Sequence, residues 1–237
     1  MSKILEGKEG VICQMDDILV FGESKDTHDK RLESVLHTLK EAGLTLNRDK
    51  CEFEKEEVVF LGHLINEKGI QADPEKVKSL CSYPSPTSKK ELKRFMGVVN
   101  YLKKFTAELA QNTVAMRELL KSSTAWFWGD QQEKEFQRVK QVMTSTPILT
   151  PFEMGKCTRL STDASSFGLG AALLQETLEG WKLIAYASRS MTQAERRYAQ
   201  VEKEALAICW AAEKFHFYLA GREFEVETDH KPLVSAL

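Results

Sequence analysis

The sequence lacks the features that mark secreted, membrane-spanning or zinc-binding proteins. Its 237 residues include five cysteines, widely spaced and without a Cys-x-x-Cys pair, which argues for reduced thiols inside a cell and against a zinc module. No apolar run approaches the roughly 20 residues that cross a membrane, and the opening MSKILEGKEG is too charged for a signal peptide. The net charge is only −2, so bulk composition neither supports nor excludes a polyanionic ligand. We expect an intracellular chain with no membrane segment.

The apolar content is sufficient for a packed fold. Hydrophobic residues make up 42% of the chain, which at this length suits one large or two modest domains. Proline and serine cluster at 83–88 (YPSPTS), and a second break falls at 122–124 (SST), so both stretches are candidate boundaries. There is no internal repeat or low-complexity tract.

The last third of the chain predicts three strands, a helix and a fourth strand. The expected strands are 156–162 (KCTRLST), 168–175 (GLGAALLQ), 181–187 (WKLIAYA) and 224–228 (FEVET). Thr192 to Glu195 fits a capping box that opens the helix, and Gly221 ends it. The predicted apolar stripe of the helix consists of Ala205, Ile208, Cys209, Ala212, Phe215 and Leu219. This order indicates a mixed α/β sheet domain.

Three carboxylates occupy informative places in that pattern. Asp163 ends the first strand, Glu204 lies inside the helix and Asp229 ends the last strand. A hard cation such as Mg²⁺ is held by carboxylates and by phosphate oxygens of a substrate, and strand ends can meet a helix face although they are distant in sequence. Taken singly, Asp163 could be a turn former and Glu204 a solvated acid. Together they predict the metal site of a two-metal nuclease.

Five short motifs in order give this region a specific resemblance. They are TDAS at 162–165, GLGA at 168–171, ASR at 187–189, EKEALA at 202–207 and TDHKPL at 228–233. The region resembles the ribonuclease H domain of gypsy-like LTR retrotransposon polyproteins. The resemblance implies that Asp163, Glu204 and Asp229 bind catalytic Mg²⁺, or Mn²⁺, and that Glu202 is the weaker candidate. It also implies a fourth acid, which we expect beyond Leu237.

An acidic pair interrupts the apolar segment 11–22 (VICQMDDILVFG). Adjacent carboxylates are costly in a buried hairpin unless a metal or a turn takes up their charge, and alternation along a strand lets only one of them point fully into a shared site. The segment resembles the aromatic-x-Asp-Asp hairpin of the reverse transcriptase palm, with Gln14 in the aromatic position. The resemblance implies that Asp16 is the principal metal ligand and Asp17 its neighbour. The other palm Asp is expected before Met1.

The next segments resemble the remainder of a palm. Residues 26–29 (DTHD) could cap a helix, whose apolar stripe would be Leu32, Val35, Leu36 and Leu39 and which Gly43 would close. Residues 44–53 and 58–65 are expected strands. Inside the second lies a run that resembles the primer grip, the hairpin that holds the end of the growing strand: Phe60, Leu61, Gly62 and His63.

A basic helix is predicted after the proline-rich break. Ser88 to Glu91 is a second capping box, and the helix it opens would bury Leu92, Phe95, Met96 and Val99. Charges opposite an apolar stripe usually form a solvated face. Here the helix resembles the thumb element that follows a duplex backbone, which implies contacts from Lys89, Lys90, Lys93 and Arg94; Lys103 and Lys104 follow nearby. A tether helix at 133–143 is expected next, with Trp126, Phe127 and Trp128 as packing residues.

The combined expectation is an α/β (α+β) chain with four parts. These are the end of a reverse transcriptase palm (1–83), a thumb-like region (84–122), a tether (123–150) and an incomplete ribonuclease H-like domain (151–237). The complete protein would copy RNA into DNA and cut the RNA strand of RNA–DNA hybrids, in a cytoplasmic particle or the nucleus. We expect this chain alone to be inactive as a polymerase, although it would bind a hybrid or primer–template duplex, and at most weakly active as a nuclease. The alternative is an inactive remnant, or a co-opted nucleic-acid-binding or interaction module.

Overall fold

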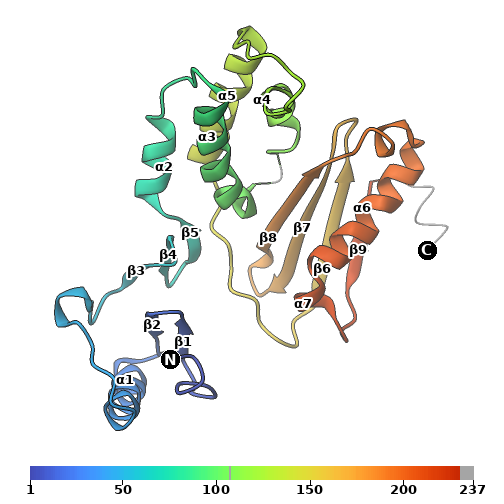
Figure 1. Ribbon diagram of the computed structural model, residues 1–237. Helices are drawn as coiled ribbons and strands as arrows, with labels where there is room; N and C mark the ends of the chain where they lie inside the picture. The colour runs from blue at the N-terminus through green and yellow to red at the C-terminus, as the bar shows by residue number, and fades with distance from the viewer. Residues whose placement is uncertain (107, 230–237) are drawn as a thin grey trace. The chain divides into compact units, whose positions relative to one another are not determined.

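The computed structural model describes residues 1–106 and 108–229, and the chain divides into two compact units (Figure 1). The first unit spans Met1–His63 and the second begins at Leu64. Helices and strands are mixed throughout, which confirms the expected α/β (α+β) class. Among the residues that the structure describes, no helix combines the length and apolar character needed to cross a membrane.

A hairpin and a helix form the first unit. β1 (Val11–Gln14) and β2 (Asp17–Val20) pair antiparallel, and α1 (Lys25–Glu41) packs beside them. The expected cap at residues 26–29 is wrong, because the helix starts earlier: the Ser24 side chain accepts a hydrogen bond from the Thr27 amide. The buried centre of this unit consists of Leu5, Val35 and Leu39.

Two of the expected palm strands differ in the structure. Residues 44–53 form no strand; Asn47 accepts a hydrogen bond from the Asp49 amide and so favours a local turn, the 3-10 helix η1 (Arg48–Lys50). The single strand expected at 58–65 is two strands, β3 (Glu57–Phe60) and β4 (His63–Asn66). Leu61 (φ 49°) and Gly62 (φ 70°) form the turn between them. Positive φ at both central residues is the geometry of a two-residue hairpin loop.

The first half of the second unit is helical around one core. Its elements are β5 (Gly69–Ala72), α2 (Pro74–Cys81), α3 (Lys89–Leu102), η2 (Lys103–Phe105), η3 (Gln111–Thr113), α4 (Val114–Leu119) and α5 (Asp130–Thr144). The Ser88 side chain caps α3 as expected, and all four predicted apolar residues of that helix are buried. Phe95 of α3 meets Phe136 of α5 with ring centroids 4.6 Å apart. The helix expected as a tether is therefore part of this core.

The second half is a four-stranded sheet covered by a helix. β6 (Thr158–Ala164), β7 (Gly168–Thr177), β8 (Gly180–Ser190) and β9 (Glu225–Glu227) lie in the order β8-β7-β6-β9, with β9 parallel to β6 and the other pairs antiparallel. α6 (Gln200–Lys214) runs beside the sheet and α7 (His216–Leu219) follows it (Figure 1). The predicted series of three strands, a helix and a fourth strand is confirmed.

The start and the buried face of α6 differ from expectation. The box of Thr192 and Glu195 forms, with bonds of 2.7 and 3.3 Å, but only the short 3-10 helix η4 (Glu195–Arg197) follows it. The helix begins at Gln200, where Glu202 accepts the Ala199 amide. The predicted stripe is wrong by one residue in the first three turns: the buried side chains of α6 are Glu204, Ala207 and Ala211. Glu204 therefore shares the face that packs on the sheet.

Candidate functional site

Three acids from separate elements converge at one edge of the sheet. One carboxylate oxygen each of Asp163, Glu204 and Asp229 lies within 4.8 Å of the other two. β6 and β9 are parallel neighbours, so their carboxyl ends, next to Asp163 and Asp229, lie at the same edge. α6 packs across β6 and brings Glu204 to that edge from one face. The structure thus places the three residues together, while their catalytic role stays a prediction.

Glu204 is the unusual member of this acidic cluster. Its exposed fraction is only 3%, whereas Asp163 and Asp229 are exposed. Oε1 accepts a hydrogen bond of 2.6 Å from Gln200, while Oε2 is buried with no hydrogen-bond partner among the described residues. Burial raises the pKa of the Glu204 carboxyl above its usual value, the charges of Asp163 and Asp229 raise it further, and hydrogen bonds from Gln200 and from the Ala164 backbone oppose the shift. A bound cation would relieve this repulsion.

The donor set fits a hard divalent cation. Carboxylate oxygens are the ligands that Mg²⁺ and Mn²⁺ prefer, and a buried carboxylate oxygen without a partner costs free energy until something neutralises it. A cavity of about 230 Å³ adjoins Asp163, and its lining includes the small residues Ser161, Gly170 and Ala172. Their lack of bulk leaves room for a substrate group beside the acids.

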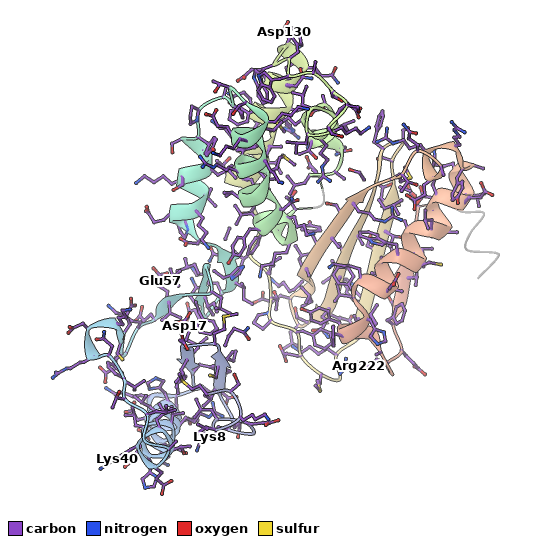
Figure 2. The ribbon with its side chains drawn as sticks, viewed as in Figure 1. Lys8, Asp17, Lys40, Glu57, Asp130 and Arg222 are labelled. Carbon is purple, nitrogen blue, oxygen red and sulfur yellow. The ribbon has the colours of Figure 1, made fainter. Side chains whose placement is uncertain are left out.

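The other acidic pair lies in the first unit. Asp16 lies in the turn between β1 and β2, after Met15 (φ 54°), and Asp17 is the first residue of β2 (Figure 2). Both side chains are exposed, so the desolvation cost expected for a buried hairpin does not arise. Within the described ranges, neither belongs to a group of three potential ligands close enough to share an ion.

The primer-grip-like residues form a tight turn. Phe60 ends β3 and His63 begins β4, with Leu61 and Gly62 between them. The Leu61 side chain is 44% exposed. The geometry is that of a tight hairpin, in which Leu61 is exposed while Phe60, Gly62 and His63 are half-buried.

The basic residues of α3 fall into two groups. Lys90, Lys93 and Arg94 are exposed on one face of the helix. Lys89 is half-buried, and its ammonium donates to the backbone oxygens of Lys121 (2.6 Å) and Thr124 (2.5 Å). The interpretation of Lys89 as a residue of the exposed side is wrong, because it holds the segment that follows α4. Lys104 is also half-buried, and burial lowers its pKa.

Sequence reasoning missed Gln200, the first residue of α6. Its amide nitrogen donates to Glu204 Oε1 and, at 2.8 Å, to the carbonyl oxygen of Ala164. The signal was present, because positions four apart on a helix are neighbours. It depended on knowing that the helix starts at Gln200 and not near Thr192.

Two family models match parts of the chain. Residues 1–65 match the reverse transcriptase (RNA-dependent DNA polymerase) family, and residues 128–226 match the RNase H-like domain found in reverse transcriptase. The second match contains Asp163 and Glu204, and the first contains Asp16, Asp17 and the turn at 60–63.

Curated relatives match nearly all of the chain. It is 36% identical over 236 residues to the Transposon Tf2-3 polyprotein of Schizosaccharomyces pombe, covering 98% of this chain and 18% of that protein. It is 38% identical over 248 residues to the retrovirus-related Pol polyprotein from transposon opus of Drosophila melanogaster, covering 99% of this chain and 25% of that protein. The chain therefore spans a quarter or less of these relatives' length.

A solved structure shows the same fold. The foamy viral protease-reverse transcriptase in complex with RNA/DNA hybrid superposes with a TM-score of 0.85 at 23% identity, covering 95% of this chain and 31% of that chain. At this identity the likeness concerns the fold alone. With the two domain matches and the Pol polyprotein relatives, the comparisons show that the chain belongs to the LTR retrotransposon Pol polyproteins, as a segment joining part of a reverse transcriptase domain to an RNase H-like domain.

Proposed function

We propose that the RNase H-like part of this chain, residues 151–237, hydrolyses the RNA strand of RNA–DNA hybrids with Mg²⁺ or Mn²⁺ held by Asp163, Glu204 and Asp229. The supporting observation is the buried Oε2 of Glu204, which has no hydrogen-bond partner among the described residues, in a cluster whose oxygens lie within 4.8 Å of one another. When bound, the ion would neutralise charge at the phosphate and activate water.

The three proposed metal ligands differ in their exposure to solvent. Glu204 is a buried residue of α6, so it supplies a metal ligand whose side chain is held in place by packing. Asp163 and Asp229 are exposed and face the medium from which a substrate arrives. The strand register sets Asp163 opposite Gly170 and Ser161 opposite Ala172, so the side chains next to Asp163 on β7 are small. The small residues beside Asp163 leave space for a phosphodiester on this side of the cavity, which Glu108 and Gln111 also line.

The N-terminal part of the chain carries a second part of the same proposal. We infer that residues 1–83 contribute Asp16, as principal ligand, and Asp17 to a polymerase metal site of the whole protein, with Phe60, Leu61, Gly62 and His63 as a primer-grip-like turn. The match of residues 1–65 to reverse transcriptases supports this role. The thumb-like region 84–122 and the tether 123–150 complete the proposed division. Within it, Lys90, Lys93 and Arg94 would contact the backbone of a hybrid or primer–template duplex.

Cleavage of a hybrid with a labelled RNA strand tests the nuclease assignment. We expect wild-type chain to cut the RNA strand weakly with Mg²⁺ or Mn²⁺ and not with EDTA. Asp163→Asn should reduce the rate by about 100-fold or more, because losing a ligand removes several kcal/mol of charge stabilisation. Glu202→Gln is the matched control, since Glu202 lies on the same helix, outside the cluster, and caps Ala199.

The outcomes separate two functions. Cleavage that survives Asp163→Asn would assign the activity to a contaminant or another site. Hybrid binding without cleavage by the wild-type chain would favour the alternative, a catalytically inactive remnant or co-opted nucleic-acid-binding module.

A further inference from the structure

One amide group connects two elements of the acidic cluster. Gln200 opens α6, one turn before Glu204. Its Nε2 lies 2.6 Å from Glu204 Oε1 and 2.8 Å from the carbonyl oxygen of Ala164, the residue that follows Asp163 on β6. The same side chain therefore contacts a proposed ligand directly and the backbone next to another.

The chemistry of the partners fixes the orientation of this amide. A backbone carbonyl and an ionised carboxylate can only accept hydrogen bonds, so the group that faces both must be the side-chain nitrogen with its two N–H donors. Both donors are then used. The Gln200 side chain therefore bridges Ala164 and Glu204, a contact called the Gln200 bracket below, and it has no donor left for a substrate.

The bracket determines which oxygen of Glu204 stays available. Oε1 is held by Gln200, and Oε2 is buried with no hydrogen-bond partner within the described part of the chain. The carboxylate also shares its cluster with Asp163 and Asp229, which repel it. Without a donor on Oε1, rotation of the side chain away from the two aspartates would reduce this repulsion.

We propose that Gln200 is a positioning residue for the metal centre, which it serves by bridging β6 at Ala164 to Glu204 and holding Oε2 toward the shared ion. This inference rests on the proposed metal site and adds a residue to it. A purely structural tie between α6 and β6 is the competing explanation. Under that explanation, losing the Gln200 hydrogen bonds would lower the stability of the fold without changing the affinity of the folded protein for the ion.

Calorimetric titration of the full chain with Mn²⁺, without nucleic acid, distinguishes the two. Gln200→Met keeps the length and removes both donors, and we expect its dissociation constant to rise about 10-fold or more, as for other groups that orient metal ligands. Gln200→Asn keeps the donors but is one methylene shorter, so it should weaken binding similarly. Gln193→Met, at an exposed glutamine, is the matched control and should bind as wild type does.

Thermal unfolding in EDTA shows whether each variant is folded, and only folded variants are compared. An unchanged dissociation constant for Gln200→Met, beside a wild-type chain that binds Mn²⁺, would overturn the positioning role and leave the metal site standing. A wild-type chain that binds no divalent ion would overturn both.

The Mn²⁺ dependence of hybrid cleavage gives a second readout. In the Gln200→Met variant we expect the midpoint to move to higher Mn²⁺ and the maximal rate to return at saturating ion. A lower maximum at an unchanged midpoint would contradict positioning, because it would indicate a contact with the substrate.

Discussion

Replacing Glu204 by glutamine should stabilise the metal-free protein while removing its affinity for divalent ions. In the folded chain its carboxylate is buried and lies within 4.8 Å of two other carboxylates. Repulsion at that distance is about 0.9 kcal/mol per pair at the dielectric constant of water and about 3.5 kcal/mol at an effective value of 20. Asp163 and Asp229 are exposed, so the lower figure applies.

Glutamine keeps the shape and one acceptor, so the cost of the change is small. The new amide oxygen can still accept from Gln200, although the bond is weaker by about 1 kcal/mol without the charge. Relief of two repulsive pairs, about 1.7 kcal/mol in total, less that loss leaves a net gain of about 0.7 kcal/mol for Glu204→Gln. For a unit of this size each kcal/mol moves the melting temperature by about 2–4 °C, which predicts a rise of about 1–3 °C.

Calorimetry in EDTA near neutral pH and low salt is the assay, with Glu202→Gln as the charge-matched control on the same helix. That control should be neutral or slightly destabilising, since a glutamine there still accepts the Ala199 amide. Adding Mg²⁺ should stabilise wild-type protein and not Glu204→Gln, because only the native site binds the ion. A lower melting temperature for Glu204→Gln in EDTA would refute the repulsion argument.

Two further predictions concern charged groups outside the acidic cluster. Glu195 receives bonds of 2.8 and 2.9 Å from Arg189, which lower its pKa to about 2; the stability it contributes is complete above about pH 4.5 and disappears as the pH falls toward 2. Glu195→Gln should therefore unfold with less acid sensitivity in that window, by an amount on the order of 1–2 kcal/mol, and equal sensitivity in urea titrations would contradict this. On α3, Lys90, Lys93 and Arg94 should be replaced by glutamine. We expect the slope of log binding constant against log salt concentration to flatten by about 0.9 for each phosphate that is no longer neutralised. An unchanged slope would show that these side chains form only a solvated face.

The sequence predicted the sheet and the convergence of its acids because both depend on local signals. Asp163 is the penultimate residue of β6 and Asp229 follows β9 by two residues, and two parallel neighbours must end at one edge. The helix between them is long enough to be recognised from the spacing of its apolar residues. These elements needed no knowledge of distant partners.

What the sequence could not supply depends on contacts between distant residues. The buried face of α6 is set by Ala207 and Ala211 packing on the sheet, and a count of apolar residues instead favoured the bulkier Ile208. The alternating pattern at 44–53 has no partner strand within the described residues, so the local turn at Asn47 prevails. The role of Lys89 likewise depends on backbone oxygens more than 30 positions away.

The position of Asp229 in the acidic cluster depends on β9, a short strand with few contacts. Within the described part of the chain, three residue pairs join it to β6, all three of its residues are exposed, and Arg159 forms ion pairs with Glu225 and Glu227. Asp229 reaches the cluster only while this short edge strand is docked. An ion that requires Asp229 would therefore draw its affinity partly from strand docking and strengthen that docking in return. Amide hydrogen exchange along 225–227 would report occupancy of the site, so the state of the metal centre could be followed from the backbone.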